Sequence, residues 1–246
     1  MNTDEELLLD LLSSLSKRGP IDAIGKGANS VGKTLQDALG IKHSTNTKNK
    51  LFNYIISGTT SPGGYGRTNL FACVPDWNAS NMKSSKELVN EFGREDIKRG
   101  YSKSLFCTST SNGPNGFNLV LKVKPSVKSL EECYLIGDVK RPLLVWDTVR
   151  LQTKLQALKK IAIITALPLT TGSKTRYHYR YVDLFERPDA AEFYDLLELG
   201  SITIDHLISI KEGTTQAREQ GPLFKIRNDC REVLYGKFKR MDLMNL

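Results

Sequence analysis

The sequence has few of the side chains from which metal centres and disulfide frameworks are built. Its four cysteines form no C-x-x-C pair, so the spacing typical of structural zinc sites is absent. The three histidines, His43, His178 and His206, are too scattered to suggest a cluster of ligands. The cysteines are therefore expected to be reduced thiols, as is usual in a cytoplasm.

Long apolar runs and a secretory leader are also missing. The longest apolar stretch, 161–169, contains Thr165; it suits a buried strand and falls well short of the roughly 18 residues that suggest a membrane span. The acidic start, with Asp4, Glu5 and Glu6, does not suit the basic first region of a signal peptide. We therefore predict a cytoplasmic protein with no membrane partner.

The composition fits an ordinary globular protein with a basic surface. The chain has 246 residues, of which 39% are hydrophobic and 25% are charged, and this suits one or two compact domains. A net charge of +8 favours a polyanionic partner such as nucleic acid. A basic protein that is merely soluble is the alternative interpretation.

Apolar spacing and turn residues predict helices that alternate with strands, without strict βαβ order. Helices are expected at 4–16, 30–39, 86–92, 147–160, 189–199 and in a short segment near the end. Strands are expected at 51–57, 68–74, 104–110, 117–123, 134–136, 143–146, 161–166, 177–182, 202–208 and 223–227. This order favours an α/β or α+β fold with a mixed sheet. The strand at 177–182 is expected to be exposed, with its tyrosines serving for packing rather than base stacking.

The sequence from Gly27 to Thr34, with Gly32 and Lys33, matches the pattern G-x-x-x-x-G-K-[ST] of a phosphate-binding loop. Such a loop needs a buried strand before it, so that backbone N–H groups and the helix dipole face a phosphate. A helix, a Gly-Pro break and a polar turn come before it instead, so nucleotide binding is disfavoured.

Residues 25–41 read GKGANSVGKTLQDALGI, and residues 48–57 read KNKLFNYIIS. The first segment resembles the opening helix of the MvaI/BcnI restriction endonucleases, which are relatives of the nicking enzyme MutH. The family pattern is roughly GKG-x-x-x-VGKTLE-x-x-LGI, followed by a strand that reads D-x(4)-E-x-K. The segments NLFACVPDW (69–77), MKSSKEL (82–88), ITIDHLI (202–208) and EQGPLFKI (219–226) also resemble one branch of this family, in the same order. The resemblance covers about residues 21–235.

The resemblance implies a restriction-endonuclease-like mixed-sheet core of the PD-(D/E)xK type and a second, DNA-recognition lobe, arranged around a DNA cleft. We place the N-terminal lobe approximately at 1–130. Residues 131–246 would complete the core and carry the recognition lobe. The implied partner is double-stranded DNA with a short target of the CC(N)GG type, bound by a monomer or a heteromer.

The positions that match the family's catalytic residues hold no carboxylate. The helix glutamate corresponds to Gln36, and the strand's aspartate, glutamate and lysine correspond to Lys50, Ile55 and Ser57. Mg²⁺ prefers oxygen ligands, especially carboxylates, and activates the water that attacks the phosphodiester. We therefore expect no metal and no cofactor, and Mg²⁺ only if the chain is active.

A different acid could serve if this alignment is shifted. Asp138 and Lys140, preceded by Glu131 and Glu132, spell D-x-K. The D-x-K pattern alone is weak, because it occurs by chance in most chains of this length.

The resemblance also places residues that could contact DNA. Phosphate contacts are expected from Lys26, Lys33, Lys48 and Lys50 near the would-be active cleft and from Arg67 and Lys83 beside the second signature. The family's recognition region corresponds here to a stretch with Lys211, Gln216, Arg218, Glu219 and Gln220, followed by Lys225 and Arg227. Arginine can bond guanine, glutamine can bond adenine, and glutamate can accept from cytosine. The alternative is a solvated loop of charged side chains.

Three hypotheses follow for function. The first is a catalytically inactive homologue that recognises double-stranded DNA, as a specificity subunit or as a partner of an active nuclease. The second is an active type II endonuclease or nickase with a rebuilt site. The third is a non-catalytic subunit of an antiphage defence assembly, in which the fold serves protein contacts only.

Overall fold

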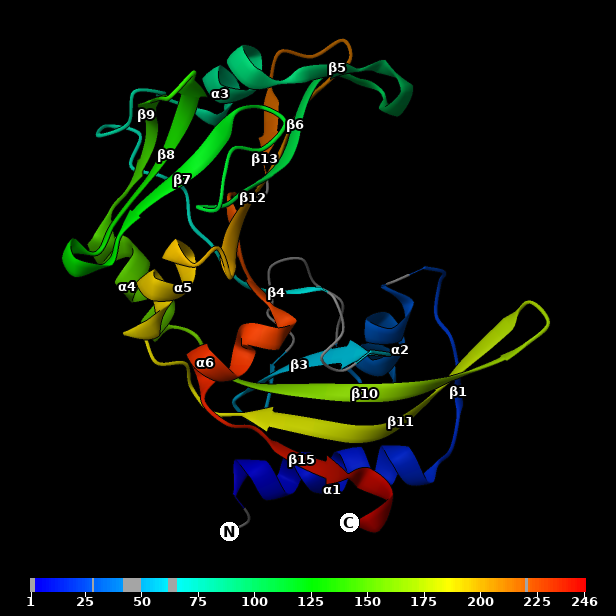
Figure 1. Cartoon of the computed structure of the whole chain (residues 1–246). Helices are drawn as coiled ribbons and strands as arrows, with labels where there is room; N and C mark the ends of the chain where they lie inside the picture. The colour runs from blue at the N-terminus through cyan, green and yellow to red at the C-terminus, as the bar shows by residue number, and fades with distance from the viewer. Residues whose placement is uncertain (1–2, 28, 42–49, 62–65, 220) are drawn as a thin grey trace. The chain divides into compact units, whose positions relative to one another are not determined.

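The structure, a computed structural model, describes residues 3–27, 29–41, 50–61, 66–219 and 221–246 (Figure 1). The chain forms two compact units. Unit 1 comprises 1–64, 159–188 and 235–246, and unit 2 comprises 65–158 and 189–234. The boundary suggested near residue 130 falls inside unit 2, where strands β7 (Leu119–Lys124) and β8 (Ser129–Ile136) pair with each other.

Unit 1 is built on a six-stranded sheet, which we call sheet A. Its strand order is β1-β11-β10-β3-β2, and β15 pairs with β11. The strands are β1 (Ile21–Asp22), β2 (Lys50–Leu51), β3 (Tyr54–Thr59), β10 (Lys160–Thr171), β11 (Lys174–Phe185) and β15 (Lys239–Asp242). The β10–β3 pair is parallel and the other pairs are antiparallel, so sheet A is mixed, as the sequence predicts.

Two helices cover the core face of sheet A. Helix α1 (Asp4–Lys17) begins with a capping box between Thr3 and Glu6, which satisfies backbone N–H groups at its first turn. Its leucines pack with α2 (Ser30–Ala38) and with the inward side chains of the sheet, which are Tyr54, Ile56, Ala162, Ile164, Ala166, Tyr177, Tyr179, Val182 and Leu184. The short turn η4 (Leu243–Asn245) adds Leu243 to this core.

The strand expected at 51–57 is a hairpin. Phe52 and Asn53 both have positive φ, at 46° and 63°, and positive φ at both central residues defines the tight turn that suits the twist of paired strands. The turn places Lys50 opposite Ile55 and Leu51 opposite Tyr54.

Unit 2 contains two sheets. Sheet B has the order β4-β14-β12-β6-β5, with β13 beside β12, and sheet C has the order β7-β8-β9. Besides β7 and β8, the strands are β4 (Arg67–Ala72), β5 (Arg94–Asp96), β6 (Tyr101–Ser109), β9 (Val139–Trp146), β12 (Ile202–Lys211), β13 (Ala217–Glu219) and β14 (Leu223–Arg227). The helices are α3 (Ser85–Phe92), α4 (Thr148–Gln156), α5 (Glu192–Glu198) and α6 (Arg231–Tyr235), with short turns η1 (Ile97–Arg99), η2 (Pro125–Val127) and η3 (Asn228–Cys230). α6 ends at the boundary with unit 1.

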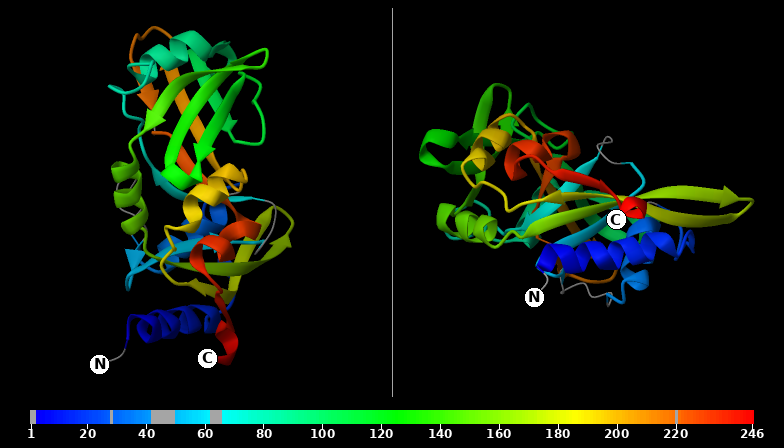
Figure 2. Two further views of the ribbon diagram at one scale, coloured as in Figure 1. Left: turned by 60° about the vertical axis from the view of Figure 1, so that its left-hand side comes forward. Right: turned by 90° about the horizontal axis from the view of Figure 1, so that it is seen from below.

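Sheets B and C pack through one face each, and both can be followed in Figure 2. Phe224 of β14 contacts Trp146 of β9 edge to face, with ring centroids 6.0 Å apart. The indole N–H of Trp146 donates to the backbone carbonyl of Cys73 at 2.9 Å, so the buried aromatic ring keeps its polar atom paired. The inward residues of β12 are Ile202, Ile204, His206, Ile208 and Ile210, all buried.

Besides the hairpin, the predicted elements are largely confirmed, with two further corrections. The helix expected at 147–160 begins after Asp147, whose side chain caps it, but it ends at Gln156. The strand expected to be exposed at 177–182 extends over β11, and Tyr177 and Tyr179 are buried. Helices α1 and α2 supply the second apolar layer that covers those rings, and the packing role expected of these tyrosines is confirmed.

Candidate nucleic-acid interface

One side of sheet B gathers several of the cations selected from the sequence. Antiparallel pairing sets Thr203 opposite Lys225, Arg227 opposite Arg67, and Ser209 opposite Arg218. Side chains directly opposite each other project from the same side of a sheet. We call this set the polar face of sheet B, and it consists of Arg67, Thr203, Asp205, Arg218, Lys225 and Arg227.

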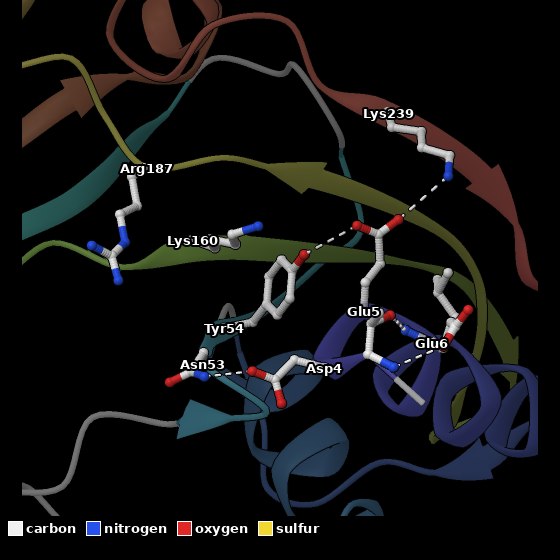
Figure 3. A pocket seen from close by; sticks show the side chains of 10 residues that line it. Asp4, Glu5, Glu6, Asn53, Tyr54, Lys160, Arg187 and Lys239 are labelled. Carbon is white, nitrogen blue, oxygen red and sulfur yellow. Dashed lines mark hydrogen bonds and ion pairs between the residues drawn. The ribbon is translucent and has the colours of Figure 1, made fainter. Parts of the chain in front are cut away.

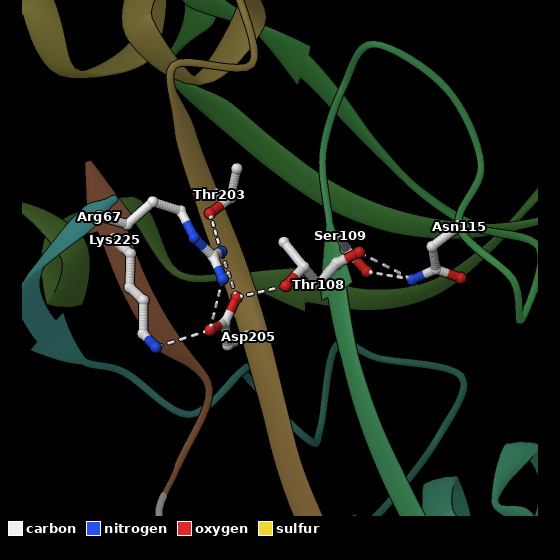
Figure 4. Close-up of polar contacts among 7 residues, drawn as sticks. All are labelled: Arg67, Thr108, Ser109, Asn115, Thr203, Asp205 and Lys225. Carbon is white, nitrogen blue, oxygen red and sulfur yellow. Dashed lines mark hydrogen bonds and ion pairs between the residues drawn. The ribbon is translucent and has the colours of Figure 1, made fainter. Parts of the chain in front are cut away.

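Asp205 is the centre of this face (Figure 4). Its carboxylate accepts two hydrogen bonds from the guanidinium of Arg67, at 2.5 and 3.1 Å, and contacts the ammonium of Lys225 at 2.7 Å. The hydroxyl of Thr108 donates to it at 2.7 Å, and Arg67 also donates to Thr203 at 2.8 Å. The carboxylate is thus saturated with donors, and the cations in the set outnumber it.

The electrostatics of Asp205 follow from these contacts. Burial by itself raises the pKa of this carboxyl, but the hydrogen bonds from Lys225, Thr108 and Arg67 outweigh burial and bring the pKa below its ordinary value. Asp205 therefore stays ionised at neutral pH. The side chains of Arg67 and Lys225 keep 31% and 19% of their surface exposed, so each fixed cation still reaches solvent.

Neighbouring residues of the recognition stretch face opposite sides of sheet B. Along β13, Arg218 is exposed, whereas Glu219 is half-buried and has one carboxylate oxygen fully buried. Arg218 is thus available on the polar face, and Glu219 points toward the core. A direct base contact by Glu219 therefore gains no support from this arrangement.

The other predicted contacts of unit 2 are spread over its surface. Lys211 is exposed at the end of β12, and Gln216 is exposed in the following loop. Arg227 is engaged with Asp229 through two hydrogen bonds, one of them at 3.1 Å from its Nε. The ammonium of Lys83 donates to the backbone carbonyls of Asn78 and Ser80, which folds it back onto its own loop. Gln220 lies outside the described residues.

In unit 1, the hairpin of β2 and β3 contains the positions that correspond to the family's catalytic strand. Lys50 and Ile55 are cross-strand partners, and Ser57 lies two residues further on the same side of β3 as Ile55. Ile55 is half-buried and Ser57 is exposed. Gln36 is half-buried on α2. The side chain of Lys50 and the whole of Lys48 lie outside the described residues.

The same side of sheet A carries a buried carboxylate. Ile163 pairs with Ser57 on one side and with Asp183 on the other, and Asp183 in turn pairs with Arg240. Both oxygens of Asp183 accept from the guanidinium of Arg240, at 2.6 and 2.7 Å. This carboxylate is therefore neutralised by a cation in a bidentate pair, and an apolar side chain separates it from Ser57.

The weak alternative motif occupies a different kind of position. Asp138 lies in the exposed turn between β8 and β9 of unit 2, and Lys140 is exposed near the start of β9. Ile55 and Ser57 belong instead to unit 1. Within the described parts of the chain, histidine, cysteine, aspartate and glutamate nowhere form a group of three or more suited to a metal ion.

The hydroxyl of Thr34, which ends the glycine-rich pattern, is engaged in local hydrogen bonds. Thr34 is buried, donates to the carbonyl of Ser30 at 2.8 Å and accepts from the amide of Ile24 at 2.8 Å. A hydroxyl used twice in local structure is not free to bind a nucleotide-bound metal. Lys26 and Lys33 are exposed on either side of this turn, where they remain predicted phosphate contacts.

A pocket of about 680 Å³ near the start of α1 was not anticipated from the sequence (Figure 3). Glu5 accepts from Lys239 at 3.3 Å and lies 3.5 Å from the hydroxyl of Tyr54, and Asp4 accepts from Asn53 at 2.5 Å. Lys160 pairs with Glu186 at 2.7 Å. The walls of the pocket carry three acids and three cations, so the lining has no net formal charge; these are Asp4, Glu5, Glu6, Lys160, Arg187 and Lys239.

Comparisons with known proteins agree with this architecture. Two solved structures share the fold: a complex of the restriction endonuclease MvaI with its cognate DNA substrate (TM-score 0.77, 19% identity, 99% of each chain covered) and MvaI in the absence of DNA (TM-score 0.58, 20% identity, 98% of each chain covered). A search of curated proteins gave no match. The fold is thus that of a restriction endonuclease.

The sequence itself matches the MvaI/BcnI restriction endonuclease family over residues 9–235, and the chain belongs to that family. The recognition made from the scattered sequence signatures is confirmed. In the described residues, the structure has no helix long and apolar enough to cross a membrane.

Sequence reasoning missed the two residues that organise these surfaces. Asp205 is the single acid of β12 and Asp183 is the single acid of β11, and their arginine partners come from distant parts of the chain. An aspartate in the middle of a buried strand is itself a signal, because a buried carboxylate needs a partner. The partner's identity, however, is set only by strand pairing.

Proposed function

We propose that the chain is a double-stranded DNA-binding protein of the MvaI/BcnI family that recognises a short sequence and no longer cleaves it. The observation that carries this proposal is the polar face of sheet B. Asp205 holds Arg67 and Lys225 in place, and Arg218 lies exposed on the same face. Fixed cations bind phosphates, and an exposed arginine can read guanine.

The loss of cleavage is supported by the donor set at the family's catalytic positions. Ser57 offers one hydroxyl and Gln36 one amide, while Ile55 offers no ligand. This set does not suit Mg²⁺, which prefers carboxylate oxygens, and Asp183 is already engaged by Arg240. A cytoplasmic location, inferred from the cysteines and the acidic start, remains a prediction, and so does a partner nuclease or defence subunit, which the resemblance implies.

Selection of duplexes from a random pool, with and without Mg²⁺, tests the binding proposal. We expect one short GC-containing site to be enriched equally in both conditions, because binding needs no metal. Failure to enrich any duplex would overturn DNA binding and favour a role in protein contacts only.

Incubation of supercoiled plasmid containing the selected site with Mg²⁺ or Mn²⁺ tests the loss of cleavage. We expect neither nicked nor linear product. Cleavage that is lost in Asp138→Ala but kept in Lys50→Ala would show that the active site lies at the alternative motif.

A further inference from the structure

A buried pair of titratable side chains joins the two sheets of unit 2. His206 of β12 and Glu132 of β8 are both fully buried, and the His206 Nε2 lies 2.9 Å from the Glu132 Oε2. Removing two charged groups from water often costs more than their attraction returns, and an apolar pair of similar volume is commonly at least as stable. The pair therefore calls for a reason other than net stability.

A third titratable side chain approaches the same place from β13. Glu219 pairs with Ile208, which lies two residues from His206 on the same side of β12. Among the described residues, Glu219 Oε1, Glu132 Oε1 and His206 Nδ1 are all buried without a hydrogen-bond partner. Buried polar atoms of this kind are costly unless nearby charges compensate for the lost water.

The charges around His206 supply that compensation. Burial alone lowers the pKa of His206, but Glu132, Glu219 and Asp205 together raise it above its ordinary value. Cys107 lies opposite His206 on β6, and burial raises the pKa of its thiol to about 12, so the thiol adds no charge. A protonated His206 therefore attracts carboxylates from both β8 and β13.

The attraction matters for β13 because this strand has little backbone pairing, although α3 also contacts it. β13 has three residues and pairs only with β12 in the described sheet. A slip of one residue would exchange the sides of Arg218 and Glu219. We propose that Glu219, attracted to the buried His206–Glu132 pair, is a positioning residue that fixes the register of β13 and holds Arg218 on the polar face of sheet B.

The inference rests on the proposed function only for the role of Arg218 in reading DNA. The positioning of β13 can be measured without DNA, by amide hydrogen exchange, which reports local opening. In Glu219→Gln, the β13 amides should exchange about tenfold faster relative to those of β12. This corresponds to a decrease of about 1.4 kcal/mol in the free energy of local opening of β13. Glu219→Asp should keep most of the protection.

Glu212→Gln is the matched control. It removes the same charge from an exposed position in the turn after β12, and it should leave β13 unchanged. Protection of β13 in Glu219→Gln that equals that of the unmodified protein would overturn the inference.

A pH series on the unmodified protein decides the question even if Glu219→Gln does not fold. Deprotonation of His206 removes the attraction for Glu219, so β13 protection relative to β12 should fall as pH rises through the raised pKa of His206. A ratio that is constant over that range would contradict the proposal.

DNA binding separates the two proposals. If the selected duplex is bound, Glu219→Gln should lower the preference for it over a scrambled duplex by about tenfold, and adding Arg218→Ala should cause no further loss, since the two changes act on one contact. A further loss in the double variant would mean that Glu219 affects sequence preference independently of Arg218. If no duplex is bound, the proposed function fails, while the exchange experiments still test the positioning of β13.

Discussion

At the scale of single residues, Asp205 has the largest consequences for the polar face of sheet B. Its carboxylate holds Arg67 and Lys225 while itself almost fully buried. Removing its charge leaves two cations close together and leaves donors from Arg67, Lys225 and Thr108 without their common acceptor. Both effects destabilise the folded chain.

Asp205→Asn should therefore lower the free energy of unfolding at pH 7 by about 2 kcal/mol, the range for hydrogen bonds to a charged group. The pKa of Asp205 is depressed in the folded chain, so its contribution is present above the ordinary aspartate pKa, near 3.9, and is lost as pH falls through the folded value. Urea titrations at several pH values check this. The difference between the two proteins should shrink below about pH 4, and a constant difference would assign the effect to packing.

Arg218 is the residue expected to read a base. Its exposure on the polar face opposite Ser209 leaves its planar fork free for guanine. Arg218→Ala should remove roughly 1–3 kcal/mol of discrimination between the selected and a scrambled duplex, while weak nonspecific binding persists.

Lys211→Ala is the control for Arg218→Ala, because Lys211 is an exposed cation at the end of the neighbouring strand. It should weaken both duplexes equally. If Arg218→Ala does the same, Arg218 contacts phosphate instead of a base. If Arg218→Ala changes neither affinity, β13 does not face DNA.

At the scale of elements, the end of α3 leaves no room for a side chain at Gly93. A Cβ on Gly93 would lie 2.3 Å from the backbone oxygen of Val89 and 2.8 Å from the Val89 Cγ2. α3 contacts β6, β12 and β13, so any shift of the helix is transmitted to the strand that carries Arg218.

Gly93→Ala should lower the free energy of unfolding by about 1–3 kcal/mol, because the helix end must move away from the added methyl group. Gly116→Ala is the matched control, since a Cβ there meets no atom within 4 Å. Thermal unfolding of both variants provides the measurement. Equal melting temperatures would mean that the α3 end adjusts at no cost.

At the scale of the whole molecule, the net charge of +8 should govern how binding responds to salt. The logarithm of the binding constant should fall linearly with the logarithm of salt concentration, by about 0.9 for each phosphate contact. Binding that is insensitive to salt between low and physiological ionic strength would exclude a phosphate-dominated interface.

Lys225→Ala should reduce that slope by about 0.9 and weaken all duplexes alike. Lys140→Ala removes the same charge from an exposed position on β9 in sheet C and should leave the slope unchanged. Fluorescence anisotropy at several salt concentrations measures both. A change in sequence preference in Lys225→Ala would instead mark Lys225 as a base contact.

The sequence by itself determined the local elements and the family. Caps such as Thr3, Ser84 and Asp147 set helix starts through hydrogen bonds within three residues, and such short-range signals are readable from the chain. The ordered signatures predicted the family that the comparison confirms. The positions Lys50, Ile55 and Ser57 were also readable as lacking carboxylates.

Only the tertiary structure decided which side chains share a surface. Whether Arg218 or Glu219 points outward depends on the register of β13, and a shift of one residue reverses the answer. The partners of Asp205 and Asp183 come from strands far away in sequence. Each unit is built from separate segments of the chain, and which segments pair within a unit is likewise set by strand pairing between distant residues. These non-local pairings depend on the burial of whole sheet faces, which no short stretch of sequence specifies.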